Sequence, residues 1–83
     1  MTLTLRYFAW VRERVGAPSE TIETGAATVA DLVEELRSRE GRYARAFADL
    51  RSVRVAVDKE VADFTAPIAG AREVAFFPPM TGG

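Results

Sequence analysis

The chain contains few side chains that could carry out chemistry by themselves. Its 83 residues include no cysteine and no histidine. A thiolate nucleophile, a thiolate metal site and a serine triad with a histidine base are therefore excluded, and no bound metal is expected. What remains is the carboxylate that ends Gly82-Gly83, a few residues after Pro78-Pro79. We interpret the carboxylate of Gly83 as the reactive group that the rest of the chain presents.

Glycine suits such an end because it lacks a Cβ and can thread a narrow channel in extended or positive-φ conformations. Two terminal glycines arise by chance in about one chain in two hundred, and their place after a Pro-Pro pair strengthens the signal. No glycine-rich phosphate loop precedes a helix, and Glu34-Glu35 falls on a polar helix face, not in a cleft. The chain is therefore not expected to be catalytic alone or to bind a cofactor; a separate ATP-using enzyme would activate the tail.

The elements that must hold this tail follow from the spacing of apolar residues. Alternating apolar and polar positions predict strands near residues 2–8, 20–24, 53–58, 61–62 and 73–77. In the first strand Leu3, Leu5 and Tyr7 face the core. Pro78-Pro79 ends the last strand because proline has no N–H to donate.

Helical spacing indicates one main helix and two shorter pieces. Thr28 and Asp31 form a capping box, and Val29, Leu32, Val33 and Leu36 then make one apolar stripe that ends at Gly41. Residues 9–15 form a short helix that Gly16 ends, and residues 43–50 form another short helical piece. The main helix therefore has one face to bury against the strands.

This order of elements predicts an α+β fold of the β-grasp, or ubiquitin-like, kind. One mixed sheet would carry the main helix across one face, with the first and last strands central and parallel. Residues 1–77 are expected to form this domain and residues 78–83 a flexible tail ending in Gly-Gly.

A sheet covered by one helix layer leaves its other face bare. Five apolar residues fall on the non-core side of their strands or at strand ends: Phe8, Ala56, Val61, Ala75 and Phe77. They predict an exposed apolar patch for a partner protein. The alternative is a one-residue error of register, which would bury them. Nearby charged residues are interpreted as ordinary solvated surface: Arg6, Arg12, Arg54, Lys59 and Arg72.

The net charge of −1 and a pI near 5.4 give no basic excess for binding phosphates, so no nucleic-acid partner is expected. No apolar run approaches the roughly 20 residues of a membrane span, and the N-terminus lacks a signal-peptide pattern. We therefore expect no membrane association and a cytoplasmic location.

Two stretches resemble the MoaD-type sulfur carriers, the small subunits of molybdopterin synthase in the ThiS/MoaD family. Residues 8–16 (FAWVRERVG) are similar to that family's helix after the first strand. Residues 73–83 (EVAFFPPMTGG) are close to its C-terminal signature. Asp58, where the family more often has Asn, and Met80, in place of a β-branched residue, depart from its pattern.

The resemblance implies a β-grasp fold and a specific chemistry for the tail. An E1-like activating enzyme would adenylate Gly83 with ATP, and a thiocarboxylate would replace the adenylate. Met80, Thr81 and Gly82 would line a channel of the large synthase subunit, where the sulfur is donated to the molybdopterin dithiolene. Phe8, Val61 and Phe77 match apolar contact positions toward partner proteins. The catalytic residues of this sulfurtransferase, a hetero-oligomer, are then expected on the large subunit.

Three other functions share much of this pattern. The chain could carry sulfur for another pathway such as the thiazole of thiamine. It could be a ubiquitin-like modifier attached to lysines of target proteins, or a plain binding module with an inert tail. Fold and patch alone do not separate these.

Overall fold

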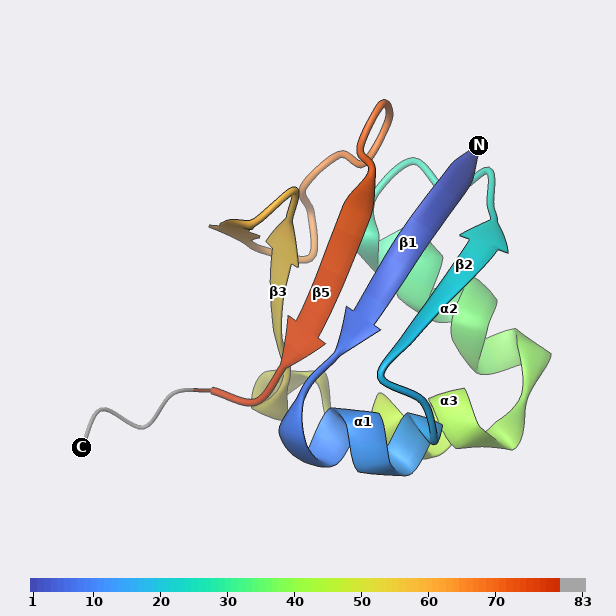
Figure 1. Ribbon diagram of the computed structural model, residues 1–83, viewed down its shortest axis with the longest axis vertical. Coiled ribbons are helices and arrows are strands. Elements are labelled where there is room, and N and C mark those ends of the chain that lie inside the picture. The colour runs from blue at the N-terminus through green and yellow to red at the C-terminus, as the bar shows by residue number, and fades with distance from the viewer. Residues whose placement is uncertain (80–83) are drawn as a thin grey trace.

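The structure, a computed structural model, describes residues 1–79 and is built around one five-stranded sheet (Figure 1). The strand order is β2-β1-β5-β3-β4. The strands are β1 (Thr2–Tyr7), β2 (Ser19–Glu23), β3 (Arg54–Val57), β4 (Glu60–Ala62) and β5 (Glu73–Phe77). β1 and β5 are parallel and the other pairs are antiparallel. The predicted mixed sheet with adjacent parallel first and last strands is confirmed.

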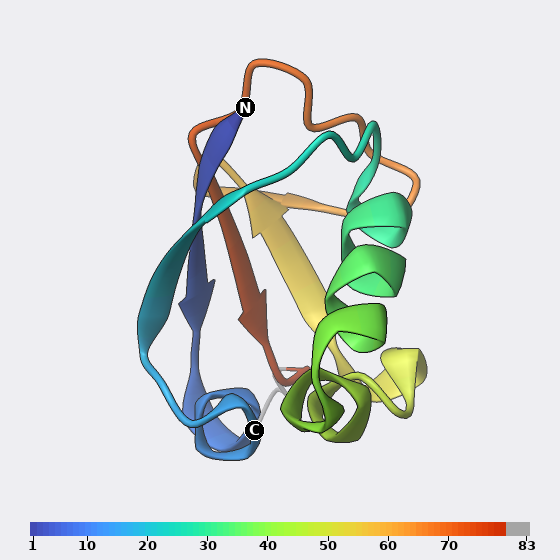
Figure 2. The same ribbon diagram turned by 90° about the vertical axis from the view of Figure 1, so that its right-hand side faces the viewer.

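The helices are α1 (Ala9–Val15), α2 (Val29–Arg39), α3 (Gly41–Ala46) and a 3-10 turn (Leu50–Ser52). Helix α2 runs across one face of this sheet, whereas α1 lies at the lower end of the sheet, below the ends of β1 and β5 (Figure 1 and Figure 2). α2 is the main helix, and its predicted apolar stripe is fully buried. The sheet therefore has one face in the core and one face open, as the α+β prediction required.

The core lies between β5 and the helices, with Phe76 at its centre. The Phe76 ring packs 4.9 Å from that of Phe47 and 6.1 Å from that of Tyr7, measured between ring centres. Leu3, Leu5 and Tyr7 are buried as predicted, and Ile68 fills the core from the loop before β5. In a chain this short, such a core takes up most of the large apolar side chains.

The predicted helix boundaries are confirmed at two ends and wrong at a third. The hydroxyl of Thr28 accepts a hydrogen bond from the Asp31 amide at 3.2 Å, and Gly16 ends α1 with a φ of 93°. Gly41, however, does not end α2. Glu40 breaks the helix by adopting an extended backbone, and Gly41 is the first residue of α3.

A polar network ties α3 to the first two strands. One oxygen of Glu20 accepts hydrogen bonds from the hydroxyls of Tyr7 (2.9 Å) and Tyr43 (2.7 Å), and the other accepts from Arg42 (2.8 Å). Burial opposes ionisation of Glu20, but these hydrogen bonds outweigh it and hold the pKa of Glu20 below its ordinary value. Burial, with the Glu20 contact, raises the pKa of Tyr43 to about 12. At neutral pH the network therefore consists of an ion pair between Glu20 and Arg42 and two un-ionised tyrosine hydroxyls.

Candidate functional site

The open face of the sheet carries a groove of about 720 Å³. Its floor is a row of paired residues across three strands: Ala75 on β5 lies opposite Ala56 on β3, and Ala56 lies opposite Val61 on β4. On the other side Ala75 lies opposite Arg6 on β1. Because two single methyl groups occupy the middle of this row and larger side chains its ends, the face is hollowed along β5 and β3.

Three apolar side chains border this hollow. Val61 is 78% exposed and Phe8 is 44% exposed, whereas Phe77 is half-buried. Val61 projects from the short edge strand β4. Phe77 is the last residue of β5, and its register partner on β3 is Arg54. The structure thus brings together the three residues predicted to bind a partner; their role in binding stays a prediction.

Phe8 owes its position to the link between β1 and α1. Its amide donates to the carbonyl of Phe76 at 3.0 Å, and its extended backbone caps the helix. The next residue, Ala9, also lines the groove and has a φ of 51°, in the left-handed region that costs an alanine about 1–2 kcal/mol. This turn directs the chain under the sheet while the Phe8 ring stays at the open face.

The prediction of an exposed patch was wrong for two of its five members. Ala56 and Ala75 do lie on the open face, but they are only 8% and 7% exposed. The register was right and the exposure was not, because a single methyl group between larger neighbours is shielded from water. These alanines form the floor of the groove, and they leave the exposed apolar area to Phe8, Val61 and Phe77.

The last described residues continue along the same hollow. β5 ends at Phe77, as the Pro-Pro pair predicted, and both Pro78 and Pro79 line the groove. The predicted tail residues Met80, Thr81, Gly82 and Gly83 lie outside the described residues. The chain therefore leaves the sheet beside the apolar rim, and the tail's insertion and chemistry stay predictions.

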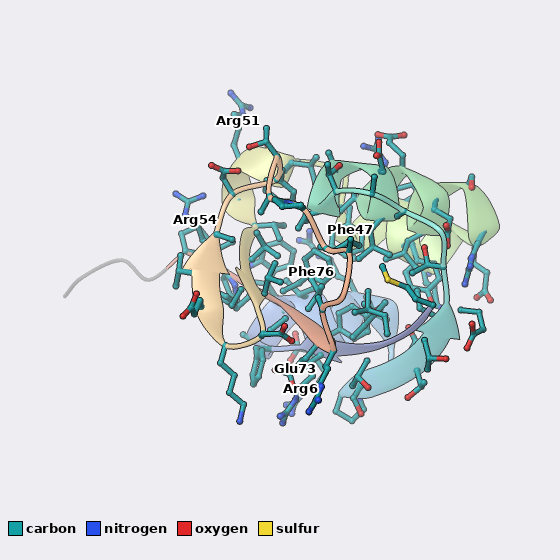
Figure 3. All side chains as sticks on the ribbon, turned by 90° about the horizontal axis from the view of Figure 1, so that it is seen from above. Arg6, Phe47, Arg51, Arg54, Glu73 and Phe76 are labelled. Carbon is teal, nitrogen blue, oxygen red and sulfur yellow. The ribbon has the colours of Figure 1, made fainter. Side chains whose placement is uncertain are left out.

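Charged side chains also border the groove. A nitrogen of Arg6 lies 3.7 Å from a carboxylate oxygen of Glu73 (Figure 3). The Arg6 guanidinium lies 5.7 Å from the centre of the Phe8 ring. Sequence reasoning missed the Arg6–Glu73 pair. The parallel register of β1 and β5, which puts Glu73 opposite Thr4 and so diagonal to Arg6, could have revealed it.

The turn between β3 and β4 forms one end of the groove, which Lys59 lines. Asp58 and Lys59 both have positive φ (49° and 73°), as a two-residue hairpin turn requires. A carboxylate oxygen of Asp58 accepts from the amides of Arg72 (2.9 Å) and Glu73 (3.0 Å), which fastens the turn to the start of β5. Asp58 therefore both adopts the positive φ that the turn needs and fastens the turn to β5.

The described part of this site is mostly apolar. Within residues 1–79, no group of three or more acidic, histidine or cysteine side chains is arranged to hold a metal ion. Every helix in that range is too short or too polar to serve as a membrane span. The groove itself is lined mostly by apolar atoms, with Arg6, Lys59 and Glu73 at its edge. Such a surface can dock apolar side chains of another protein.

Comparison with known proteins gives consistent results. Residues 5–83 match the ThiS family. The molybdopterin synthase sulfur carrier subunit of Escherichia coli is 36% identical over 77 residues, which cover 93% of this chain and 94% of the relative. The crystal structure of SAMP1 from Haloferax volcanii superimposes with a TM-score of 0.76 at 27% identity, over the whole of both chains. A complex of subunits 1 and 2 of molybdopterin-converting factor from Helicobacter pylori matches at a TM-score of 0.65 over both whole chains, and its 20% identity supports the fold alone.

A mixed five-stranded sheet with its main helix across one face and an apolar groove on the other defines a ubiquitin-like protein. The chain belongs to the ThiS family, among the molybdopterin synthase sulfur carrier subunits.

Proposed function

We propose that the protein carries sulfur on the carboxyl group of Gly83 for a molybdopterin synthase in molybdenum cofactor biosynthesis. One structural observation supports this above all: β5 ends beside an apolar groove and Pro78 and Pro79 run along it, a few residues before Gly82-Gly83. The groove provides a surface for a partner to grip, and the chain beyond it provides the reactive end. Family membership supplies the chemistry that such an end performs.

The proposed chemistry takes three steps before sulfur is donated. The Gly83 carboxylate attacks the α-phosphorus of ATP, which forms an acyl-adenylate and releases pyrophosphate. The terminal sulfur of a persulfide donor would then attack the acyl carbon and AMP would leave, which gives an acyl disulfide. A thiol reductant would cleave its S–S bond, release the donor as a thiol and leave the thiocarboxylate on Gly83. The ATP is bound by the E1-like activating enzyme. The resulting sulfur is ionised at neutral pH and is a good nucleophile for building the dithiolene.

The partner that receives the sulfur is proposed to be the large subunit of the synthase. The Helicobacter pylori structure is a complex of subunits 1 and 2, and its subunit of matching fold supports the same kind of assembly here. Phe8, Val61 and Phe77 would contact the large subunit at the groove. Met80, Thr81 and Gly82 would extend into its active site, where the residues that catalyse transfer lie.

Intact-mass measurement tests this proposal. The protein is incubated with its activating enzyme, ATP and a sulfur donor, and we expect a mass change equal to exchange of one oxygen for sulfur at Gly83. A variant lacking Gly83 is the matched control and should stay unmodified. The proposal is wrong if the full chain stays unmodified where a known carrier reacts. Adding the large subunit and the pterin precursor should then form molybdopterin, which separates this function from sulfur delivery to thiamine.

A ubiquitin-like modifier is the second candidate, because SAMP1, whose fold this chain shares at a TM-score of 0.76, is a small archaeal modifier protein. A modifier would use the same acyl-adenylate but transfer Gly83 to a lysine amine. Mass spectrometry of peptides from cells expressing the chain separates the two. Because Arg72 is the last basic residue, trypsin would leave residues 73–83 on a modified lysine. Lysines that carry this eleven-residue remnant support the modifier, and only free thiocarboxylate supports the carrier.

A further inference from the structure

The rim of the apolar groove is positively charged although the whole chain is slightly acidic. The net charge of the protein is −1. By contrast, Arg6, Lys59 and Glu73 line the groove, and a third cation, Arg54, lies beside it as the register partner of Phe77. Most of the other acidic side chains lie on the helices, on β2 and in the loops. The protein is therefore electrically asymmetric, with its positive side at the groove.

Two of these cations have no ion-pair partner among residues 1–79. Arg6 is paired with Glu73 at 3.7 Å, but no carboxylate lies within 4.0 Å of Arg54 or Lys59 in that part of the chain. Arg54 is exposed and lies opposite Phe77 on the open face; its guanidinium donates only a long hydrogen bond, 3.4 Å, to the carbonyl of Arg51. Lys59 is exposed on the β3–β4 turn and lines the groove.

These two cations stand on opposite sides of the apolar residues. Arg54 begins β3, next to the end of β5 where the chain leaves the sheet, whereas Lys59 follows β3 at its other end. The separation corresponds to a strand of four residues, or about 13 Å. A partner that covers Phe77 and Val61 would therefore lie close to both cations, and carboxylates on that partner would complement their charge.

We propose that Arg54 and Lys59 recognise carboxylates on the large synthase subunit. On that subunit the carboxylates would flank the apolar side chains that enter the groove. This inference rests on the proposed function and adds the chemistry of the partner surface. Rim charges of this kind act mainly on the rate of association, because the field reaches beyond contact distance and orients the approaching partner. Apolar contacts at Phe8, Val61 and Phe77 then govern the rate of dissociation.

The test measures association with the purified large subunit by stopped-flow at low and high salt. We expect the double variant Arg54→Gln/Lys59→Gln to associate about tenfold more slowly at low ionic strength, with little change in dissociation. At about 1 M salt the Debye length is only about 3 Å, so the difference should disappear. The charge-retaining variant Arg54→Lys/Lys59→Arg should associate like the unsubstituted chain.

Arg45→Gln is the matched control. Arg45 is also exposed and without an ion-pair partner within residues 1–79, but it lies on α3, in the helix layer. It should change association less than twofold. The inference is overturned if the double variant and Arg45→Gln associate equally fast at low salt. Absence of any complex with the unsubstituted chain would instead overturn the proposed function, whereas a complex that forms at a salt-independent rate overturns only the role of these charges.

Discussion

Phe76 and Phe77 are adjacent residues of the same type on the same strand, and they belong to different parts of the molecule. Phe76 is fully buried in contact with Phe47 and Tyr7, at the centre of the core. Phe77 points to the open face, is half-buried and borders the groove. Because side chains alternate across a strand, β5 serves folding with one face and recognition with the other.

The difference between the faces is one of packing partners. The inner face of β5 meets the aromatic and aliphatic side chains of the helix layer. The outer face meets only side chains of neighbouring strands, and both Ala75 on β5 and its partner Ala56 on β3 are too small to cover the aromatic side chains that border the groove. Apolar area left uncovered in this way is available to a partner without any change in the fold.

Phe76→Ala should show the largest effect on stability. Removal of a fully buried aromatic ring loses its transfer free energy and leaves a cavity, so the free energy of unfolding should fall by about 3–5 kcal/mol. Urea denaturation followed by circular dichroism measures this. The matched variant Phe77→Ala should cost less than about 1.5 kcal/mol, since its ring is partly in water. Equal losses at the two positions would contradict the division of β5 into two faces.

Phe77→Asp should separate recognition from folding. A carboxylate in the groove must be desolvated against an apolar partner surface, so affinity for the large subunit should fall about 100-fold, near 2.7 kcal/mol. Isothermal titration calorimetry gives the affinity, and a thermal unfolding curve checks the fold. If the domain unfolds instead, Phe77 belongs to the core and the assigned register is wrong.

Glu20→Gln should show a smaller, pH-dependent effect that leaves the groove intact. The folded-state pKa of Glu20 lies below its ordinary value of 4.5, so its ionised form stabilises the fold above that pH and the stabilisation disappears as pH falls through the folded value. We expect the variant to be less stable by about 2 kcal/mol at pH 7, because charged hydrogen bonds are lost.

The pH series supplies the control for this substitution. Denaturation curves should show that the difference in stability between Glu20→Gln and the unsubstituted chain narrows as the pH falls below 4.5. Affinity for the large subunit at pH 7 should not change, because Glu20 contacts Tyr7, Arg42 and Tyr43, away from the open face. A gap independent of pH would show that the carboxylate's charge contributes nothing to the network.

Much of the fold follows from local sequence signals. Alternation fixed the strands to within a residue or two, and the Thr28 cap and apolar stripe located α2. The error at Gly41 has a physical origin: glycine often ends helices in the left-handed conformation, but here an extended Glu40 makes the break. Which residue breaks the helix depends on how α3 packs against the rest of the fold, and the residues around Gly41 do not reveal that packing.

Local sequence signals also predicted part of the site. The alternation of side chains along each strand placed Phe8, Val61 and Phe77 on the open face, because it can be read from each strand by itself. The depth of the groove depended on which side chains lie opposite one another, and so did the Arg6–Glu73 pair. Register between distant strands is a property of the folded sheet, and local patterns leave it undetermined.

The central position of β5 makes the groove depend on a completely folded sheet. Phe8 follows β1, Val61 belongs to β4, and the two strands are joined in the sheet only through β5 and β3. Without β5 in place, the two sides of the groove are separate pieces and Phe77 is absent from its rim. A partner that binds the groove would therefore find this surface only on chains whose sheet is complete, and a misfolded chain would not present it.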